Sequence, residues 1–88
     1  MPQVRVLLPA TITTPQAPVE IACQAADVRE ALHEVAARAP RYAQRLFFKD
    51  RLLVGVLVNG RHIPPSEALG TRLTDGDRVE VMPPVAGG

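Results

Sequence analysis

The stretch that decides the fold is residues 73–88, which read Leu-Thr-Asp-Gly-Asp-Arg-Val-Glu-Val-Met-Pro-Pro-Val-Ala-Gly-Gly. Residues 74–77 have the composition of a tight turn, and residues 78–82 alternate in polarity as a half-buried strand does. Two consecutive prolines then end the strand, because proline carries no amide hydrogen for the ladder. We therefore expect a last strand that stops abruptly and continues as an extended tail over residues 83–88.

Three other segments have the pattern of strands. Residues 4–8 are mostly apolar and partly β-branched, residues 19–23 alternate in polarity, and residues 52–58 form the longest apolar run. The dipeptide Asn59-Gly60, which suits a two-residue type I′ hairpin, separates that run from a short return strand at residues 61–63. We expect residues 10–18, which contain two prolines, to form a loop or a wide turn.

One amphipathic helix is expected between the second and third strands. Asp27 is a good N-cap, and Glu30 completes a capping-box pattern three residues later. Pro40 is expected to end the helix. A single apolar stripe runs along it, made of Val28, Leu32, Val35, Ala36 and Ala39. A short turn of helix within residues 41–50, with Tyr42, Leu46, Phe47 and Phe48, is expected to plug the end of the core.

This order of elements predicts an α+β fold, with a mixed four- to five-stranded sheet and one main helix packed on one face. Residues 1–82 would form a single domain, and residues 83–88 a tail. At ~3.3 Å per residue that tail can reach roughly 20 Å from the body.

Composition narrows the classes of function. The chain has 88 residues, 47% hydrophobic and 22% charged, with a net charge of +1, which argues against a strongly electrostatic nucleic-acid binder. Its single cysteine cannot form an internal disulfide. With no targeting segment and no apolar run near the ~20 residues that span a bilayer, we expect a cytoplasmic protein that contacts no membrane.

Few side chains suggest chemistry of their own. Cys23 has the position of a buried structural thiol, and His33 and His62 show no metal-ligand spacing. Asp75 and Asp77 are better explained by turn formation than by a catalytic carboxylate pair. We therefore expect no catalytic residue and no metal site.

The terminal glycines suggest a different kind of site. A carboxylate can be activated only if another enzyme's nucleotide and nucleophile approach its carbonyl closely. Glycine has no Cβ, so Gly87 and Gly88 would fit a narrow channel and leave both faces of the carbonyl open. Ordering two glycines costs entropy, which docking of the folded body must offset.

The layout of elements, residues 57–60, residues 73–77 and the tail at residues 83–88 together resemble the ubiquitin-like sulfur carriers of the MoaD/ThiS family. That family includes the small subunit of molybdopterin synthase and the thiamine sulfur carrier. The resemblance covers essentially the whole chain, and it implies a ubiquitin-like β-grasp fold. Its specific part is the last third.

The resemblance also implies a function. A ubiquitin-activating-like adenylyltransferase would use ATP to adenylate the Gly88 carboxylate, which would become a thiocarboxylate and donate its sulfur on a synthase partner. Pro84, Val85, Ala86 and Gly87 would thread into the partner's active site. The protein itself would be a carrier and not an enzyme, with no cofactor bound.

Several interpretations of the function stay open. The tail looks most like that of the molybdopterin-synthase small subunit, whose acceptor is the large subunit. Residues 7–12 look more like carriers that supply a cysteine-synthase-like enzyme, and thiamine synthesis, tRNA thiolation or a secondary metabolite would use the same chemistry. A protein modifier that forms isopeptide bonds through Gly88 is a second class, and a purely non-covalent interaction domain is a third.

Strand parity predicts a docking face for the partner. If Val4, Val6, Val79 and Val81 face the helix, Leu7 and Met82 lie on the opposite face with Arg5, Arg78 and Glu80. Residues 52–58 are apolar on both parities, so both faces of that strand should be covered, either by a partner or by residues 41–48. Leu7, Leu57 and Met82 are the candidate docking residues.

Overall fold

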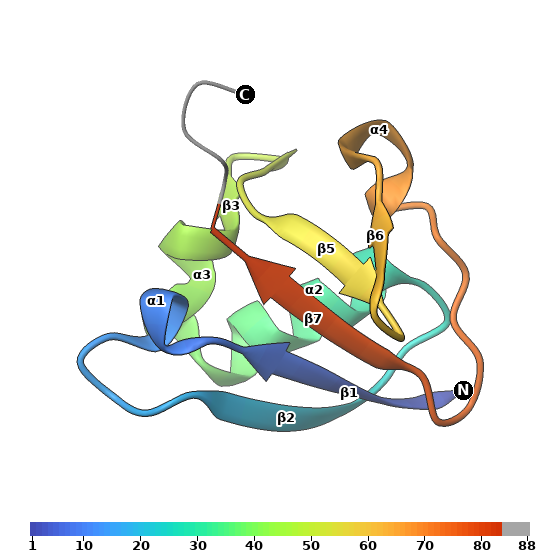
Figure 1. Cartoon of the computed structure of the whole chain (residues 1–88), viewed down its shortest axis with the longest axis horizontal. Helices are drawn as coiled ribbons and strands as arrows, with labels where there is room; N and C mark the ends of the chain where they lie inside the picture. The colour runs from blue at the N-terminus through green and yellow to red at the C-terminus, as the bar shows by residue number, and fades with distance from the viewer. Residues whose placement is uncertain (84–88) are drawn as a thin grey trace.

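The computed structural model describes residues 1–83 and contains a mixed five-stranded sheet in the order β2-β1-β7-β5-β6 (Figure 1). The central strand β7 is parallel to its neighbour β1, and every other neighbouring pair in this sheet is antiparallel. This confirms the predicted β-grasp architecture with its mixed, four- to five-stranded sheet. Their bounds are β1 Gln3–Leu8, β2 Val19–Gln24, β5 Gly55–Val58, β6 Arg61–Ile63 and β7 Arg78–Met82.

Helix α2 (Val28–Arg38) covers one face of the sheet and lies behind it in Figure 1. It begins where the sequence predicts, because the Asp27 side chain accepts a hydrogen bond of 2.8 Å from the amide of Glu30. The Glu30 carboxylate in turn accepts a bond from the amide of Ala26, one residue before the cap. The Glu34–Arg38 pair, with 3.8 Å between charged atoms, joins neighbouring turns of the same helix.

The core lies between α2 and the sheet. Val4, Val6, Val79 and Val81 are each at most 2% exposed and face the helix, as strand parity predicts. Leu32 and Val35 of α2 are fully buried against them. The opposite face of β1 and β7 is therefore left with Gln3, Arg5, Leu7, Arg78, Glu80 and Met82.

The expectation of a loop over residues 10–18 was wrong at its start, where α1 (Ala10–Thr13) forms one helical turn. The fixed φ of proline suits the position before a helix, and Pro9 is the N-cap of α1. Ile12 is buried in the core, and the Thr13 hydroxyl donates to the carbonyl of Ala17 over 2.9 Å. One buried side chain and one hydroxyl thus close a turn that polarity alone does not reveal.

Residues 40–52 hold more structure than predicted. Pro40 follows the end of α2 and also begins α3 (Pro40–Leu46), at the first helical position that proline favours. Tyr42 and Leu46 are buried, which confirms that this segment plugs the core. Phe48 was expected there too but is 62% exposed, because it lies in a separate two-stranded hairpin of β3 (Phe47–Phe48) and β4 (Arg51–Leu52).

The single strand predicted at residues 52–58 was also wrong, because residues 53–54 interrupt it. Leu52 ends β4, the amide of Leu53 bonds to the carbonyl of Leu46, and β5 begins at Gly55. Val56 and Val58 pair with buried Val81 and Val79, so they face the helix. Leu57 alone among the large apolar residues of β5 faces the other way.

Two turns lie at the start of the last strand. Asn59 and Gly60, between β5 and β6, both have positive φ (52° and 83°), as a type I′ hairpin requires. Asp77 accepts a 2.8 Å bond from the amide of Thr74, and Asp75 accepts a 2.7 Å bond from the amide of Gln3. The Asp77 carboxylate therefore closes the turn, as predicted, and the Asp75 carboxylate joins that turn to the start of β1. A further short helix, α4 (Pro65–Ala68), lies in the connection to β7.

Candidate functional site

The three predicted docking residues surround a single residue of the central strand. Glu80 of β7 is the register partner of Leu7 in parallel β1 and of Leu57 in antiparallel β5. Met82 comes two positions later on the same face of β7. The structure therefore brings Leu7, Leu57 and Met82 together around Glu80, on the face of the sheet opposite α2. We refer to these four residues as the open-face cluster.

Charge on this face is arranged in rows across the strands. One row runs Glu20, Leu7, Glu80, Leu57, His62 across five strands. The next row, farther from the end of β7, holds Arg5 beside Arg78. Along β7 itself the open face thus presents a cation, an anion and an apolar side chain in the order Arg78, Glu80, Met82.

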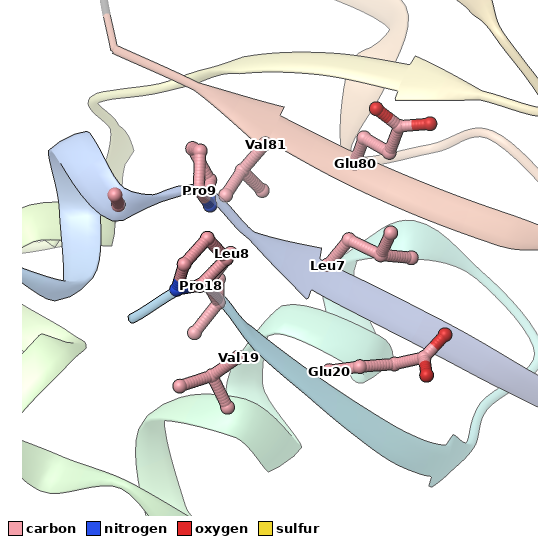
Figure 2. A pocket seen from close by; sticks show the side chains of 9 residues that line it. Leu7, Leu8, Pro9, Pro18, Val19, Glu20, Glu80 and Val81 are labelled. Carbon is pink, nitrogen blue, oxygen red and sulfur yellow. The ribbon is translucent and has the colours of Figure 1, made fainter. Parts of the chain in front are cut away.

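Leu7 lies between two carboxylates (Figure 2). Glu20 and Glu80 flank it at one end of a groove of about 320 Å³, whose other lining residues are apolar. Glu20 is 3.9 Å from Arg5, and both side chains of that pair are at least half exposed. Among residues 1–83, Glu80 makes no ion pair within 4.0 Å.

The last strand ends on this face. Met82 is 45% exposed and pairs with Gly55 of β5, and a Cβ at Gly55 would lie 3.8 Å from that of Met82. Pro83 comes next and is exposed. The predicted tail residues Pro84, Val85, Ala86, Gly87 and Gly88 lie outside the described residues. The segment in which Gly88 was predicted to react is therefore continuous in sequence with the strand that carries Glu80 and Met82.

Other candidate residues are structural. Cys23 is 4% exposed in β2, and burial, together with the nearby Glu34 carboxylate, raises the pKa of its thiol from 9.0 to about 12. A thiol with so high a pKa is a poor nucleophile at neutral pH, as the structural prediction required. His33 stacks on Phe47, with ring centroids 4.8 Å apart.

Two other kinds of feature, a metal site and a membrane-spanning helix, are not found among the described residues. Among residues 1–83 there is no group of three or more His, Cys, Asp or Glu side chains that could hold a metal ion. No helix in this part is long and apolar enough to cross a membrane. Sequence reasoning placed Glu80 on the open face but missed its central position, which only the strand register reveals.

The sequence model of the ThiS family matches residues 6–88. The chain belongs to the ThiS family. A curated relative of this ThiS-family chain, a putative sulfur carrier protein of Archaeoglobus fulgidus, is 30% identical over 97% of this chain and 98% of its own length. Small archaeal modifier protein 3 of Haloferax volcanii is 54% identical over 35 residues, which is 38% of its length.

Solved structures agree on the fold of the ThiS-family chain. Small archaeal modifier protein 1 of Methanosarcina acetivorans has a TM-score of 0.77 and 28% identity, covering all of this chain and 98% of the other. A chain of the Amycolatopsis orientalis BexX/CysO complex has a TM-score of 0.71 and 31% identity, covering 97% and 99%. The relatives of this ThiS-family protein are thus small sulfur carriers and ubiquitin-like modifiers.

Proposed function

We propose that this protein is a sulfur carrier whose reactive group is the carboxylate of Gly88. The observation that carries the proposal is the position of the open-face cluster. Leu7, Leu57 and Met82 form an apolar patch on the central strands, immediately before the segment that ends in Gly-Gly. A partner that docks on this patch has the tail of the same strand within its reach, at ~3.3 Å per residue.

The proposed chemistry proceeds in two steps on a partner enzyme. The Gly88 carboxylate attacks the α-phosphorus of ATP, pyrophosphate leaves, and an acyl-adenylate forms. A hydrosulfide ion then attacks the acyl carbon, AMP leaves with the bonding electron pair, and the thiocarboxylate remains. Adenylation is needed because a carboxylate is a poor electrophile, and the activating partner supplies the ATP. This chain contributes the acyl group and the docking surface.

We further propose that the acceptor is a synthase subunit. The resemblance of residues 83–88 to the tail of the molybdopterin-synthase small subunit favours the large subunit of that enzyme. The resemblance of residues 7–12 favours instead a cysteine-synthase-like acceptor. That a chain of the BexX/CysO complex is 31% identical to this one supports a partner protein in either case.

A second candidate function rests on the modifier relatives. Small archaeal modifier proteins 1 and 3 are similar to this chain, and a modifier would join Gly88 to a substrate lysine through an isopeptide bond. Both functions begin with the same acyl-adenylate, so they share the docking face. They differ in the nucleophile that displaces AMP.

Reconstitution tests the carrier function directly. The full chain is incubated with the ubiquitin-activating-like adenylyltransferase of the same organism, ATP and sodium sulfide, and its intact mass is measured. We expect one oxygen to be replaced by sulfur, and no change in a chain that lacks Gly87 and Gly88. A control reaction must first show that the enzyme preparation consumes ATP. An unchanged mass of the wild-type chain would then refute the proposal.

A further inference from the structure

The open face carries its charges in an order that a partner must match. Arg5 and Arg78 are register neighbours on adjacent strands, and like charges directly opposite each other in a sheet are unfavourable. Arg5 is relieved by Glu20, 3.9 Å away, whereas Arg78 has no ion pair within 4.0 Å in residues 1–83. Glu80, one row closer to the tail, is likewise unpaired there. Within the described residues, the face therefore has one free cation and one free anion in a defined direction.

A partner that covers this face removes water from the charges of Arg78 and Glu80, which is unfavourable for both. Glu80 is half-buried between Leu7 and Leu57, so any protein that covers those two leucines also removes water from the carboxylate. A charge that is buried without a partner is unfavourable, and it is tolerated only when an opposite charge or hydrogen bonds replace the water. An apolar surface alone would therefore bind this face poorly.

We propose that the activating enzyme presents a lysine or arginine to Glu80 and a carboxylate to Arg78, and that this charge order sets the orientation of docking. The inference deepens the proposed function and rests on it. If the enzyme were rotated by about 180° on the sheet, each of its charges would meet a like charge, which is unfavourable. Only the matched orientation directs the end of β7, from which the tail continues, toward the nucleotide of the enzyme.

The positions of Arg78 and Glu80 along β7 give the open face a direction. Arg78 lies far from the tail, Glu80 in the middle, and Met82 at the exposed end beside Pro83. A mixed or neutral face would hold a partner by apolar contact without choosing a direction. Since the reactive carboxylate belongs to Gly88, only a few positions after Met82, an error in direction would carry it away from the nucleotide.

Steady-state kinetics with the ubiquitin-activating-like adenylyltransferase of the same organism test this inference, with pyrophosphate release as the readout. We expect Glu80→Lys to raise KM for the carrier about tenfold or more, with most of the loss in KM rather than kcat. Glu67→Lys, the same charge change on exposed α4 away from this face, should leave KM within about twofold. The difference between the two variants should shrink at 1 M salt, where charges are screened beyond about 3 Å.

Two further variants keep the test decisive. If Glu80→Lys does not fold, Glu80→Gln removes the charge alone and should raise KM by about threefold to tenfold. Arg78→Glu should raise KM in the same way as Glu80→Lys. Equal KM values for the Glu80, Arg78 and Glu67 variants overturn the charge order while the carrier function stands. A wild-type chain that supports no pyrophosphate release overturns both.

Discussion

The Asn59 side chain joins the two turns that lie at the start of β7. Its Nδ2 donates a 2.9 Å hydrogen bond to Oδ1 of Asp77, and its Oδ1 accepts a 2.9 Å bond from the amide of Arg78. The hairpin turn after β5 and the turn before β7 are thereby fixed to each other. This link anchors one end of the strand whose other end leads into the tail.

Removing that side chain should loosen β7 without disturbing the hairpin backbone. Asn59 has a φ of 52°, which glycine adopts freely, so Asn59→Gly keeps the turn and removes both side-chain bonds. We expect the free energy of unfolding to fall by about 1–2 kcal/mol. Urea denaturation followed by circular dichroism measures this, and an unchanged midpoint would show that the link has no energetic role.

The same link predicts an acid dependence. The bond from the Thr74 amide lowers the pKa of Asp77 below its ordinary value of 3.8, and the bond from Asn59 lowers it further. A carboxyl whose pKa is lower in the folded state stabilises the fold above its unfolded pKa and loses that contribution as the pH falls. Asp77→Asn should therefore destabilise the chain at pH 6, and the difference from wild type should shrink below about pH 4.

Cys23 predicts a loss of stability at alkaline pH. Its pKa is about 12 in the folded state, so the folded protein keeps the proton on the thiol between pH 9 and 12 while the unfolded chain releases it. Stability should therefore fall as the pH rises above about 9, and less so in Cys23→Ala. Iodoacetamide should label Cys23 only after unfolding. Rapid labelling of the native protein at pH 8 would contradict its burial.

Met82 and Phe48 offer a matched test of the docking face. They are 45% and 62% exposed, but only Met82 belongs to the open-face cluster, because Phe48 lies in the β3–β4 hairpin. Met82→Asp should lower kcat/KM for adenylation by about tenfold or more, and Phe48→Asp should change it by less than about twofold. Similar losses in both variants would argue against a docking site centred on β7.

The regular elements were predictable from local pattern. Strand alternation placed Val79 and Val81 inside and Met82 outside, and the spacing of Asp27 and Glu30 located the start of α2, because burial on one face of a strand or helix imposes a period on the sequence. The end of β7 was predictable from the prolines that come directly after it.

The features that the sequence pattern missed include the break in residues 52–58, the exposure of Phe48 and the central position of Glu80. The break between Leu52 and Gly55 is invisible in a continuous apolar run, since Val54 between the two strands is as buried as a strand residue. Phe48 is hydrophobic and was expected in the core, but it is exposed because it lies in the β3–β4 hairpin. The position of Glu80 between Leu7 and Leu57 arises from pairing across three strands, which no local pattern encodes.

The most direct test of the central claim is the chemical state of Gly88 in cells. The protein is isolated under non-reducing, sulfide-free conditions, and its C-terminal peptide and all lysine-containing peptides of the proteome are analysed by mass spectrometry. We predict a fraction of chains in which sulfur replaces one oxygen of the Gly88 carboxylate. An unmodified terminus throughout, with full cellular activity of a chain lacking Gly87 and Gly88, would contradict the account.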